Sequence, residues 1–217
     1  IEETQDLKLM PLRYHKDRLL RTADFSLRYC DAAANAVRNV TFELKNGDRI
    51  ALDGANGCGK TSLVKAILAC NKDGEAVSSD YKTTGILEVP QNLIISYISQ
   101  DTSHLKGSLR DFAREKRLDY TLLLALLRQL DFERVLFDKD MELYSEGQKK
   151  KVLIASSLLT PAHLYIWDEP LNFIDVFSRM QIEELIMSHG LTMIFVEHDQ
   201  AFREKVATKG ISLNDMA

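Results

Sequence analysis

Residues 54–61 limit the possible folds of this chain more than any other stretch. They read glycine, four residues, then Gly-Lys-Thr, which is the spacing of a loop that holds phosphate with its backbone N–H groups. The apolar run at 49–53 predicts a short buried strand before the loop, and residues 62–68 predict a helix after it. A strand, a glycine loop and a helix are together the context that supports such a match. The sequence therefore predicts a nucleotide site in an α/β fold.

The loop residues are the first candidate site residues. Lys60 is expected to reach the β- and γ-phosphates, and Thr61 to offer its hydroxyl to Mg²⁺. Cys58 lies inside the loop, where it is interpreted as a small residue rather than a redox switch. The expected nucleotide contacts are Gly54, Asn56, Gly57, Cys58, Gly59, Lys60, Thr61 and Ser62.

Composition excludes several classes of function. The formal net charge is -4, which argues against a stand-alone nucleic-acid binder but allows contact through a small patch. No apolar run approaches the length of a membrane span, and no signal-peptide pattern begins the sequence. The three cysteines lack metal-ligand spacing and are expected to be free thiols. These observations predict a cytoplasmic location and a single domain of 217 residues.

The apolar pattern along the chain predicts alternating strands and helices. Alternating residues at 19–29 and 40–44 predict two antiparallel strands with one wet face, and the polar stretch 71–85 is predicted as a loop. Further strands are expected at 93–99, 163–167 and 192–196, and helices at 108–130, 148–159 and 176–188. This alternation predicts a mainly parallel sheet flanked by helices.

Asp168 and Glu169 follow an apolar strand and predict the second part of the site. Asp168 is expected to help hold Mg²⁺, and Glu169 to polarise the attacking water as general base. The alternative is an acidic pair that only ends a strand. Gln100 can contact Mg²⁺ or the attacking water, and His198 can hydrogen-bond the γ-phosphate. Alone, each would more simply be a surface or structural residue. The predicted catalytic set is Lys60, Gln100, Glu169 and His198.

Residues 144–148, Tyr-Ser-Glu-Gly-Gln, predict a second anion site. Ser145 suits a helix N-cap, Gly147 allows close approach, and the free N–H groups of a helix start attract anions. The chain already has one phosphate loop. A second anion site therefore predicts contact with a nucleotide that a partner domain binds.

The order of these motifs resembles the ATP-binding cassette (ABC) ATPase domain over nearly the whole chain. That family's signature is usually Leu-Ser-Gly-Gly-Gln, so Tyr144 and Glu146 depart from it. The resemblance implies ATP and Mg²⁺ as cofactors, with Tyr29 stacking on adenine and Mg²⁺ held near Thr61, Gln100 and Asp168. It also implies that two domains pack head to tail and close on ATP. Residues expected to act on the partner's ATP are Ser145, Glu146, Gly147, Gln148 and Asp175.

Residues 169–175, Glu-Pro-Leu-Asn-Phe-Ile-Asp, resemble the Glu-Pro-Thr-Asn-His-Leu-Asp run of ABC-F proteins. The variant looks most like the branch that protects ribosomes from antibiotics. Members carry two ATPase domains on one chain and no membrane domain, and the first domain has an arm inserted before the signature. Only 44 residues separate Gln100 from Ser145, which implies the C-terminal ATPase domain.

The resemblance implies three parts and a set of partners. Residues 1–17 are expected to end an interdomain linker, residues 18–217 to form the ATPase domain with an antiparallel β subdomain, and about 101–160 to form a helical subdomain. The expected partners are a second ABC domain, in the same chain or as a homodimer, and ribosomal RNA and tRNA. No stable membrane domain is expected.

Two other functions stay open, as does the role of one basic run. The chain could be the ATPase subunit of a membrane exporter, docking near Gln100, or a non-catalytic nucleotide sensor. Lys149, Lys150 and Lys151 could contact ribosomal RNA phosphates. A solvated helix face is the preferred interpretation of that run.

Overall fold

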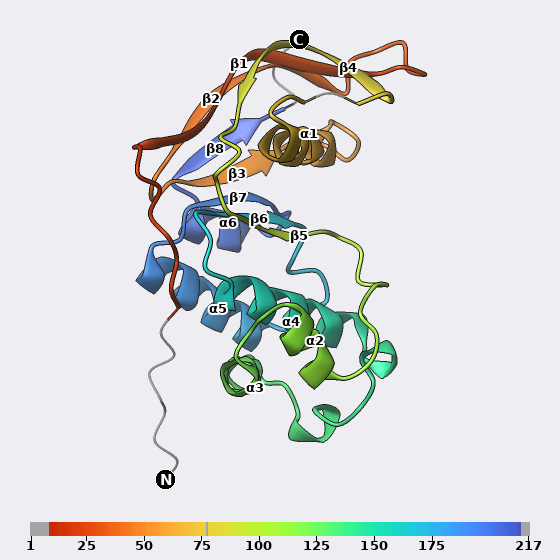
Figure 1. The fold of residues 1–217 in the computed structure, drawn as a ribbon, viewed down its shortest axis with the longest axis vertical. Coiled ribbons are helices and arrows are strands. Elements are labelled where there is room, and N and C mark those ends of the chain that lie inside the picture. The colour runs from red at the N-terminus through yellow and green to blue at the C-terminus, as the bar shows by residue number, and fades with distance from the viewer. Residues whose placement is uncertain (1–8, 77, 214–217) are drawn as a thin grey trace.

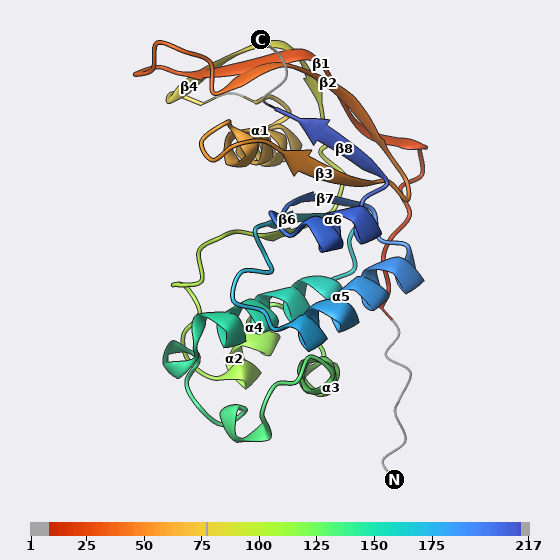
Figure 2. The same cartoon turned by 180° about the vertical axis from the view of Figure 1, so that it is seen from behind.

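Two sheets and two groups of helices build the chain in layers (Figure 1). The computed structural model describes residues 9–76 and 78–213. From one end to the other, the layers are a small antiparallel sheet, helix α1, a parallel sheet, and the remaining helices (Figures 1 and 2). This confirms the predicted α/β class with a parallel sheet flanked by helices and a separate antiparallel sheet.

The antiparallel sheet has the strand order β2-β1-β4. Its strands are β1 (Arg18–Tyr29), β2 (Val37–Lys45) and β4 (Tyr81–Glu88). β1 pairs with both neighbours in antiparallel register. The alternating burial of β2 shows one packed face and one wet face, as its sequence predicts.

The parallel sheet has the strand order β5-β6-β7-β3-β8. Its strands are β3 (Arg49–Asp53), β5 (Ile95–Ile98), β6 (Leu164–Asp168), β7 (Met193–Val196) and β8 (Lys209–Ser212). All of its strand pairs are parallel. β6 and β7 are buried along their whole length, which explains their continuous apolar sequences.

Alternate residues of β3, β6 and β7 enter two different cores. Ile166 and Ile194 pack with α1 and the antiparallel sheet. Trp167 and Phe195, one position later, pack with the helices on the opposite face. Because successive side chains of a strand point to opposite faces, these three strands stabilise both layers.

The helices divide between these two faces. α1 (Lys60–Asp73) lies between the sheets. α4 (Glu146–Leu159), α5 (Val176–His189) and α6 (Gln200–Val206) lie on the other side of the parallel sheet, with α2 (Leu109–Glu115) and α3 (Tyr120–Gln129) beyond α4. Short 3₁₀ turns span Arg134–Leu136 and Met141–Leu143.

Two sequence predictions were wrong in their boundaries. The predicted loop 71–85 contains the last turn of α1 and the first half of β4, because tertiary packing makes a polar sequence regular there. The predicted helical stretch 108–130 is two helices, separated at residues 116–119, where Arg117 has φ +56°. The sequence offered no prediction for α6 or β8.

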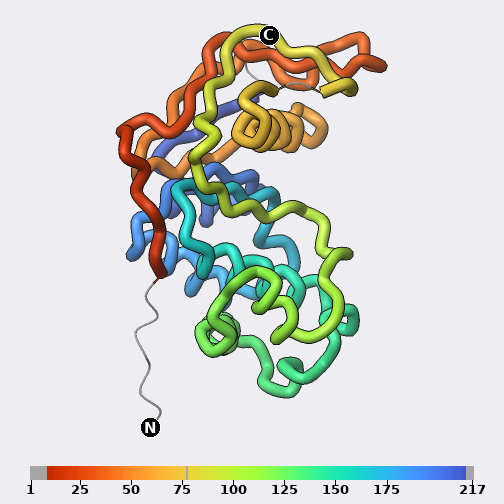
Figure 3. Tube along the Cα trace, in the orientation of Figure 1, coloured from red at the N-terminus to blue at the C-terminus, as the bar shows by residue number. Residues whose placement is uncertain are grey.

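Residues 9–17 pack along the body formed by the two sheets and their helices (Figure 3). Leu9 is buried in the helical core and Tyr14 in the other core. The Leu12 N–H donates to the Ala162 carbonyl at 2.9 Å, and the Tyr14 N–H donates to Asn46 Oδ1 at 3.0 Å. The remainder of the predicted linker, residues 1–8, lies outside the described residues. Every helix in the described ranges is too short or too polar to span a bilayer.

Candidate functional site

The glycine loop at 54–59 joins β3 to α1. Gly54, Gly57 and Gly59 have φ of +141°, +81° and +97°. A Cβ atom on Gly59 would lie 1.9 Å from the Ala36 carbonyl oxygen, so only glycine fits there. Gly59 is also the N-cap of α1, and no side chain caps this helix start. The first N–H groups of α1 are thus available to an anion.

Lys60 reaches back across this loop. Lys60 is 7% exposed. Its Nζ donates to the carbonyls of Gly54 at 2.6 Å and Ala55 at 3.0 Å. Cys58 Sγ lies 3.8 Å from the same nitrogen. Asn56 and Gly57 are exposed at the loop tip. The ammonium group is therefore held where the loop would surround phosphates.

Asp168 joins two predicted Mg²⁺ ligands from distant parts of the chain. Its Oδ2 accepts from the Thr61 hydroxyl at 2.9 Å, and its Oδ1 accepts from Gln100 Nε2 at 3.1 Å. Asp168 is 1% exposed. Burial, and then the charge of Asp168, raise the pKa of Tyr97 to about 12.

These donors fit a magnesium ion. Hydroxyl, carboxylate and amide oxygens are hard ligands, and Mg²⁺ in nucleotide sites uses one or two carboxylates together with phosphate oxygens. The described part of the chain has no cluster of three or more His, Cys, Asp or Glu side chains that could form an all-protein metal cage. The geometry therefore suits Mg²⁺ bound with a nucleotide.

Glu169 and His198 meet beside Asp168. Glu169 Oε1 lies 3.3 Å from His198 Nε2, and Glu169 Oε2 accepts from Asn172 Nδ2 at 3.1 Å. The Glu169 N–H donates to the Val196 carbonyl at 2.9 Å. Glu169 has φ +50°, an uncommon conformation for a residue with a side chain. Such strain is typical of functional sites.

Tyr29 comes to the nucleotide loop from the antiparallel sheet. Its hydroxyl and Ser62 Oγ are 3.0 Å apart. Its ring meets Tyr81 edge-on, with centroids 6.1 Å apart. The end of β1 therefore places an aromatic ring at the first turn of α1.

The predicted signature lies at the start of α4. Ser145 and Gln148 form a capping box, in which Ser145 Oγ accepts from the Gln148 N–H and Gln148 Oε1 accepts from the Ser145 N–H. A Cβ on Gly147 would lie 2.5 Å from the Phe173 carbonyl oxygen, so this turn packs directly on the loop after Glu169. Among the described residues, no hydrogen bond or ion pair links residues 145–148 to residues 54–62.

The two departures from the usual signature have local partners. Tyr144 is buried, and its hydroxyl donates to the Leu136 carbonyl at 2.7 Å. Glu146 Oε2 accepts from the Thr102 hydroxyl at 2.6 Å. These contacts join the signature to the segments that precede it in the helical layer.

Asp175 caps α5 and pairs with the signature helix. Its carboxylate accepts from the Ser178 N–H at 2.8 Å and lies 2.8 Å from Lys151 Nζ. Burial acts to raise the pKa of Asp175, but the hydrogen bonds from Lys151 and Ser178 outweigh it and hold that pKa below its usual value. Asp175 itself is exposed.

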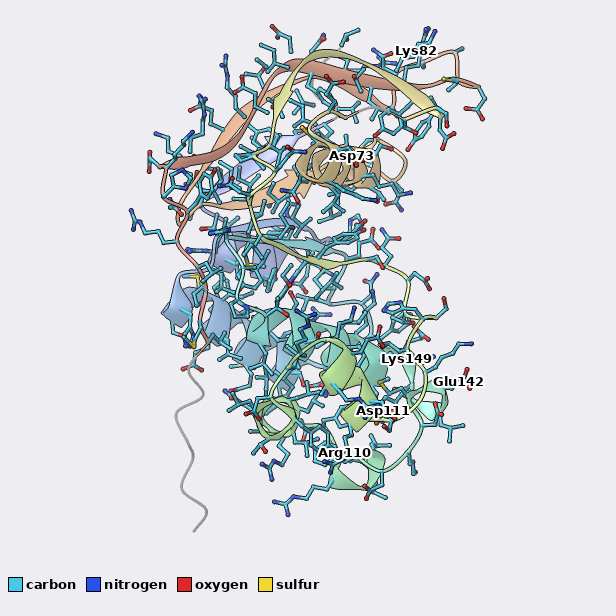
Figure 4. All side chains as sticks on the ribbon, in the orientation of Figure 1. Asp73, Lys82, Arg110, Asp111, Glu142 and Lys149 are labelled. Carbon is cyan, nitrogen blue, oxygen red and sulfur yellow. The ribbon has the colours of Figure 1, made fainter. Side chains whose placement is uncertain are left out.

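The prediction of a solvated face for Lys149, Lys150 and Lys151 is wrong. Lys150 is 4% exposed and Lys151 is 8% exposed, while Lys149 is partly buried and pairs with Glu146 at 3.6 Å. Figure 4 labels Lys149 at the start of α4. The run lies where α4 packs between the parallel sheet and the outer helices, so its cations face protein carbonyls and carboxylates.

Sequence reasoning also missed two charged residues at the strand ends. Glu197 is 5% exposed, and its carboxylate accepts from the N–H groups of His198 at 2.9 Å and Leu171 at 3.2 Å. Asp53 pairs with Arg203 of α6 at 2.7 Å. Arg203 is the main cause that lowers the pKa of Asp53. For Glu197, the sequence signal that could have pointed to a role in the site was its position directly before His198.

Comparison with known proteins identifies this arrangement. A family model described as ABC transporter matches residues 37–172, more than half of the chain. The chain belongs to the ABC transporter family of ATP-binding domains. ABC transporter F family member 2 of Arabidopsis thaliana is 27% identical over 179 residues, which cover 79% of this chain and 25% of that protein.

Two further likenesses extend over more of the matched protein. The zinc import ATP-binding protein ZnuC of Ehrlichia ruminantium is 29% identical over 202 residues, covering 88% of this ABC domain and 78% of ZnuC. A solved ATP-binding subunit of an ABC transporter superposes with a TM-score of 0.71 at 24% identity, covering 90% of this chain and 85% of that chain. This last likeness shows the shared fold.

The family establishes the basic chemistry. This chain is an ABC ATP-binding domain of a family that hydrolyses ATP, with Mg²⁺ as the usual cofactor, and whose domains pair with a second ABC domain. The chain spans about a quarter of the length of the first F-family relatives.

Proposed function

We propose that Asp168 organises an ATP-hydrolysing site in which each predicted residue has its own role. The observation that supports this most is the meeting of Thr61 and Gln100 on the Asp168 carboxylate, directly beside Glu169 and His198. Thr61 and Asp168 would hold Mg²⁺, and Gln100 would contact the metal or the attacking water. These groups come from α1 and from the ends of β5, β6 and β7. Their meeting therefore depends on the tertiary fold and not on neighbouring positions in the sequence.

Glu169 serves as the general base in this proposal. Its carboxylate is anchored by Asn172 and His198, and a carboxylate within one water of the γ-phosphate can take a proton from the attacking water. His198 would then contact the γ-phosphate, Lys60 the β- and γ-phosphates, and Tyr29 the adenine. The other ATP contacts would be Gly54, Asn56, Gly57, Cys58, Gly59 and Ser62.

Two copies of the ABC domain complete each ATP site in this proposal. The signature residues 145–148 and Asp175 have no hydrogen bond to residues 54–62 within the described ranges, which fits a role on the partner's ATP. The chain alone is expected to bind ATP but to hydrolyse it slowly. Turnover measured over a range of protein concentrations tests this. A rate per molecule that stays high at dilutions where no dimer forms would contradict it.

We further propose that the chain is the C-terminal ATPase domain of an ABC-F protein that binds the ribosome and displaces antibiotics. Support comes from residues 169–175, from the 44 residues between Gln100 and Ser145, and from the F-family relatives. ATP-driven closure would then gate binding, and hydrolysis would release the protein. The proposed parts are a linker ending near residue 17, an ATPase domain from 18 to 217 and a helical subdomain at about 101–160. The proposed setting is cytoplasmic.

Ribosome binding by the full-length protein tests this function. Glu169→Gln is expected to slow hydrolysis by at least about 100-fold, since it removes the general base, and to trap the protein on ribosomes in the presence of ATP. Glu184→Gln, an exposed substitution on α5, is the matched control and should bind and release as the wild type does. Sedimentation with ribosomes and a drug-protection assay in translation extracts are the measurements. Failure of the trapped variant to sediment with ribosomes would refute this proposal.

The alternative is the ATPase subunit of a membrane transporter. The likeness to the zinc import protein ZnuC over 78% of its length favours it. A stable complex with a transmembrane subunit after mild purification, without ribosomes, would support this alternative against the ribosomal one.

A further inference from the structure

Lys150 is a buried cation in the first half of α4, where no family motif in the sequence gives it a role. It is 4% exposed. Its Nζ donates to the Gln100 carbonyl at 3.1 Å and to the Glu169 carbonyl at 3.4 Å. Both acceptors belong to the main chain at the ends of strands β5 and β6. Lys150 therefore links the signature helix to two loops of the predicted catalytic set.

The surroundings of Lys150 combine burial with nearby negative charge. Burial lowers the pKa of Lys150, and nearby carboxylates oppose this only in part, namely those of Asp168, Glu169, Glu146 and Glu197. No carboxylate forms an ion pair with Lys150 within 4.0 Å in the described part of the chain. Burying a cation costs free energy unless hydrogen bonds satisfy it. The two carbonyl bonds are thus what fixes the ammonium group and, in turn, the two loops.

The carbonyl of Glu169 is a significant partner because this residue is strained. Its φ of +50° is a left-handed conformation that is unfavourable for a residue with a Cβ. Its N–H is held by the Val196 carbonyl of β7, and its carbonyl by Lys150 of α4. Both main-chain polar groups of Glu169 are therefore fixed by other elements, which helps to hold its carboxylate near His198.

The Gln100 carbonyl is the second partner. The Gln100 side chain donates to Asp168, so a shift of this residue's main chain would move an amide that meets the Mg²⁺ ligands. Lys150 holds this position and that of Glu169 with one nitrogen atom. Displacement of either loop would separate groups that must act together on one water molecule.

We propose that Lys150 is a positioning residue for ATP hydrolysis, which ties the Gln100 and Glu169 main chains to the helix that carries the signature. The proposal rests on the site roles assigned under the proposed function. The start of α4, at residues 145–148, would meet the partner's ATP. Lys150, two residues further along the same helix, holds the catalytic groups for this domain's own ATP. One rigid helix thus couples the two ATP sites, and a partner's nucleotide can affect the geometry of the base.

The test separates ATP binding from hydrolysis in the full-length protein. Lys150→Met keeps an unbranched side chain of nearly the same length and removes the donor. We expect its kcat to fall about 10- to 100-fold, since misplacement of catalytic groups by about 1 Å costs that much. The ATP dissociation constant should stay within about threefold, because Lys60 and the glycine loop are untouched. Lys150→Arg keeps a donor and should recover most of the lost kcat.

Lys65→Met is the matched control, since Lys65 is exposed on α1 and should leave both constants unchanged. A Lys150→Met protein with kcat within threefold of the wild type would overturn the proposal, as would a parallel loss of kcat and ATP affinity. If Lys150→Met does not fold, Lys150→Arg decides: wild-type ATP affinity with a kcat lowered less than 10-fold supports positioning by a donor, and equal losses in both overturn it.

Glu169→Gln, measured beside these variants, separates the two proposals. If Glu169→Gln keeps its turnover, the assignment of the base fails. If Glu169→Gln abolishes turnover while Lys150→Met leaves it intact, only the role of Lys150 fails.

Discussion

Gly59 and Gly57 offer the same substitution in one loop with different structural consequences. Both have positive φ, +97° and +81°. A Cβ on Gly59 would lie 1.9 Å from the Ala36 carbonyl oxygen, whereas a Cβ on Gly57 meets nothing within 4 Å. Gly57→Ala therefore tests backbone strain alone. Gly59→Ala tests the same strain together with a collision against main chain that cannot rotate away.

The magnitudes follow from these two effects. Left-handed backbone costs a residue with a Cβ about 1–2 kcal/mol, and forcing extra atoms into packed surroundings adds about 1–3 kcal/mol. Gly57→Ala should therefore lower the free energy of unfolding by about 1–2 kcal/mol, and Gly59→Ala by about 2–5 kcal/mol. The loss of unfolded-state entropy on changing glycine to alanine is similar at both positions and cancels in the comparison.

Urea unfolding without nucleotide measures this difference. With an m-value of about 2 kcal/mol/M, a difference of about 2 kcal/mol moves the midpoint by about 1 M. The midpoint of Gly59→Ala should lie well below that of Gly57→Ala. Equal midpoints, or a larger loss for Gly57→Ala, would refute the claim that close contact with residue 36 requires glycine at position 59.

Two further predictions concern buried polar contacts. Ser157→Ala should destabilise the protein by about 2 kcal/mol, because Ser157 Oγ accepts from the buried Trp167 Nε1 at 2.9 Å and lies 2.7 Å from Ser96 Oγ; a change in unfolding free energy under about 0.5 kcal/mol would contradict this. Burial lowers the pKa of His163, whose Nδ1 accepts from the Ile94 N–H at 2.9 Å. Since the folded pKa lies below the unfolded one, the stability that the neutral imidazole contributes is complete above about pH 6.5 and is lost as the pH falls from there through the lower folded pKa. His163→Asn keeps an acceptor without titrating, so its urea midpoint should change less between pH 7.5 and 5.5 than that of the wild type.

In helix α4, the sequence pattern predicted the helix start but not which side chains are buried. The capping box of Ser145 and Gln148 is local, so residue type and spacing predicted the start of α4 correctly. The burial of Lys150 and Lys151 was not predictable in the same way. A run of three lysines has no apolar periodicity, and its surroundings depend on which strands and helices pack against α4.

The sequence by itself determined the glycine loop between a strand and a helix, the buried strand that ends at Asp168, and the parallel α/β class. Each of these depends on residues that are neighbours along the chain, so their spacing carries the information. Only the tertiary structure decided that Thr61 and Gln100 meet on Asp168, across 107 and 68 residues of sequence. It also placed Lys150 against both loops of the site. The physical reason is that side-chain contact and burial are set by the packing of layers, which no local pattern records.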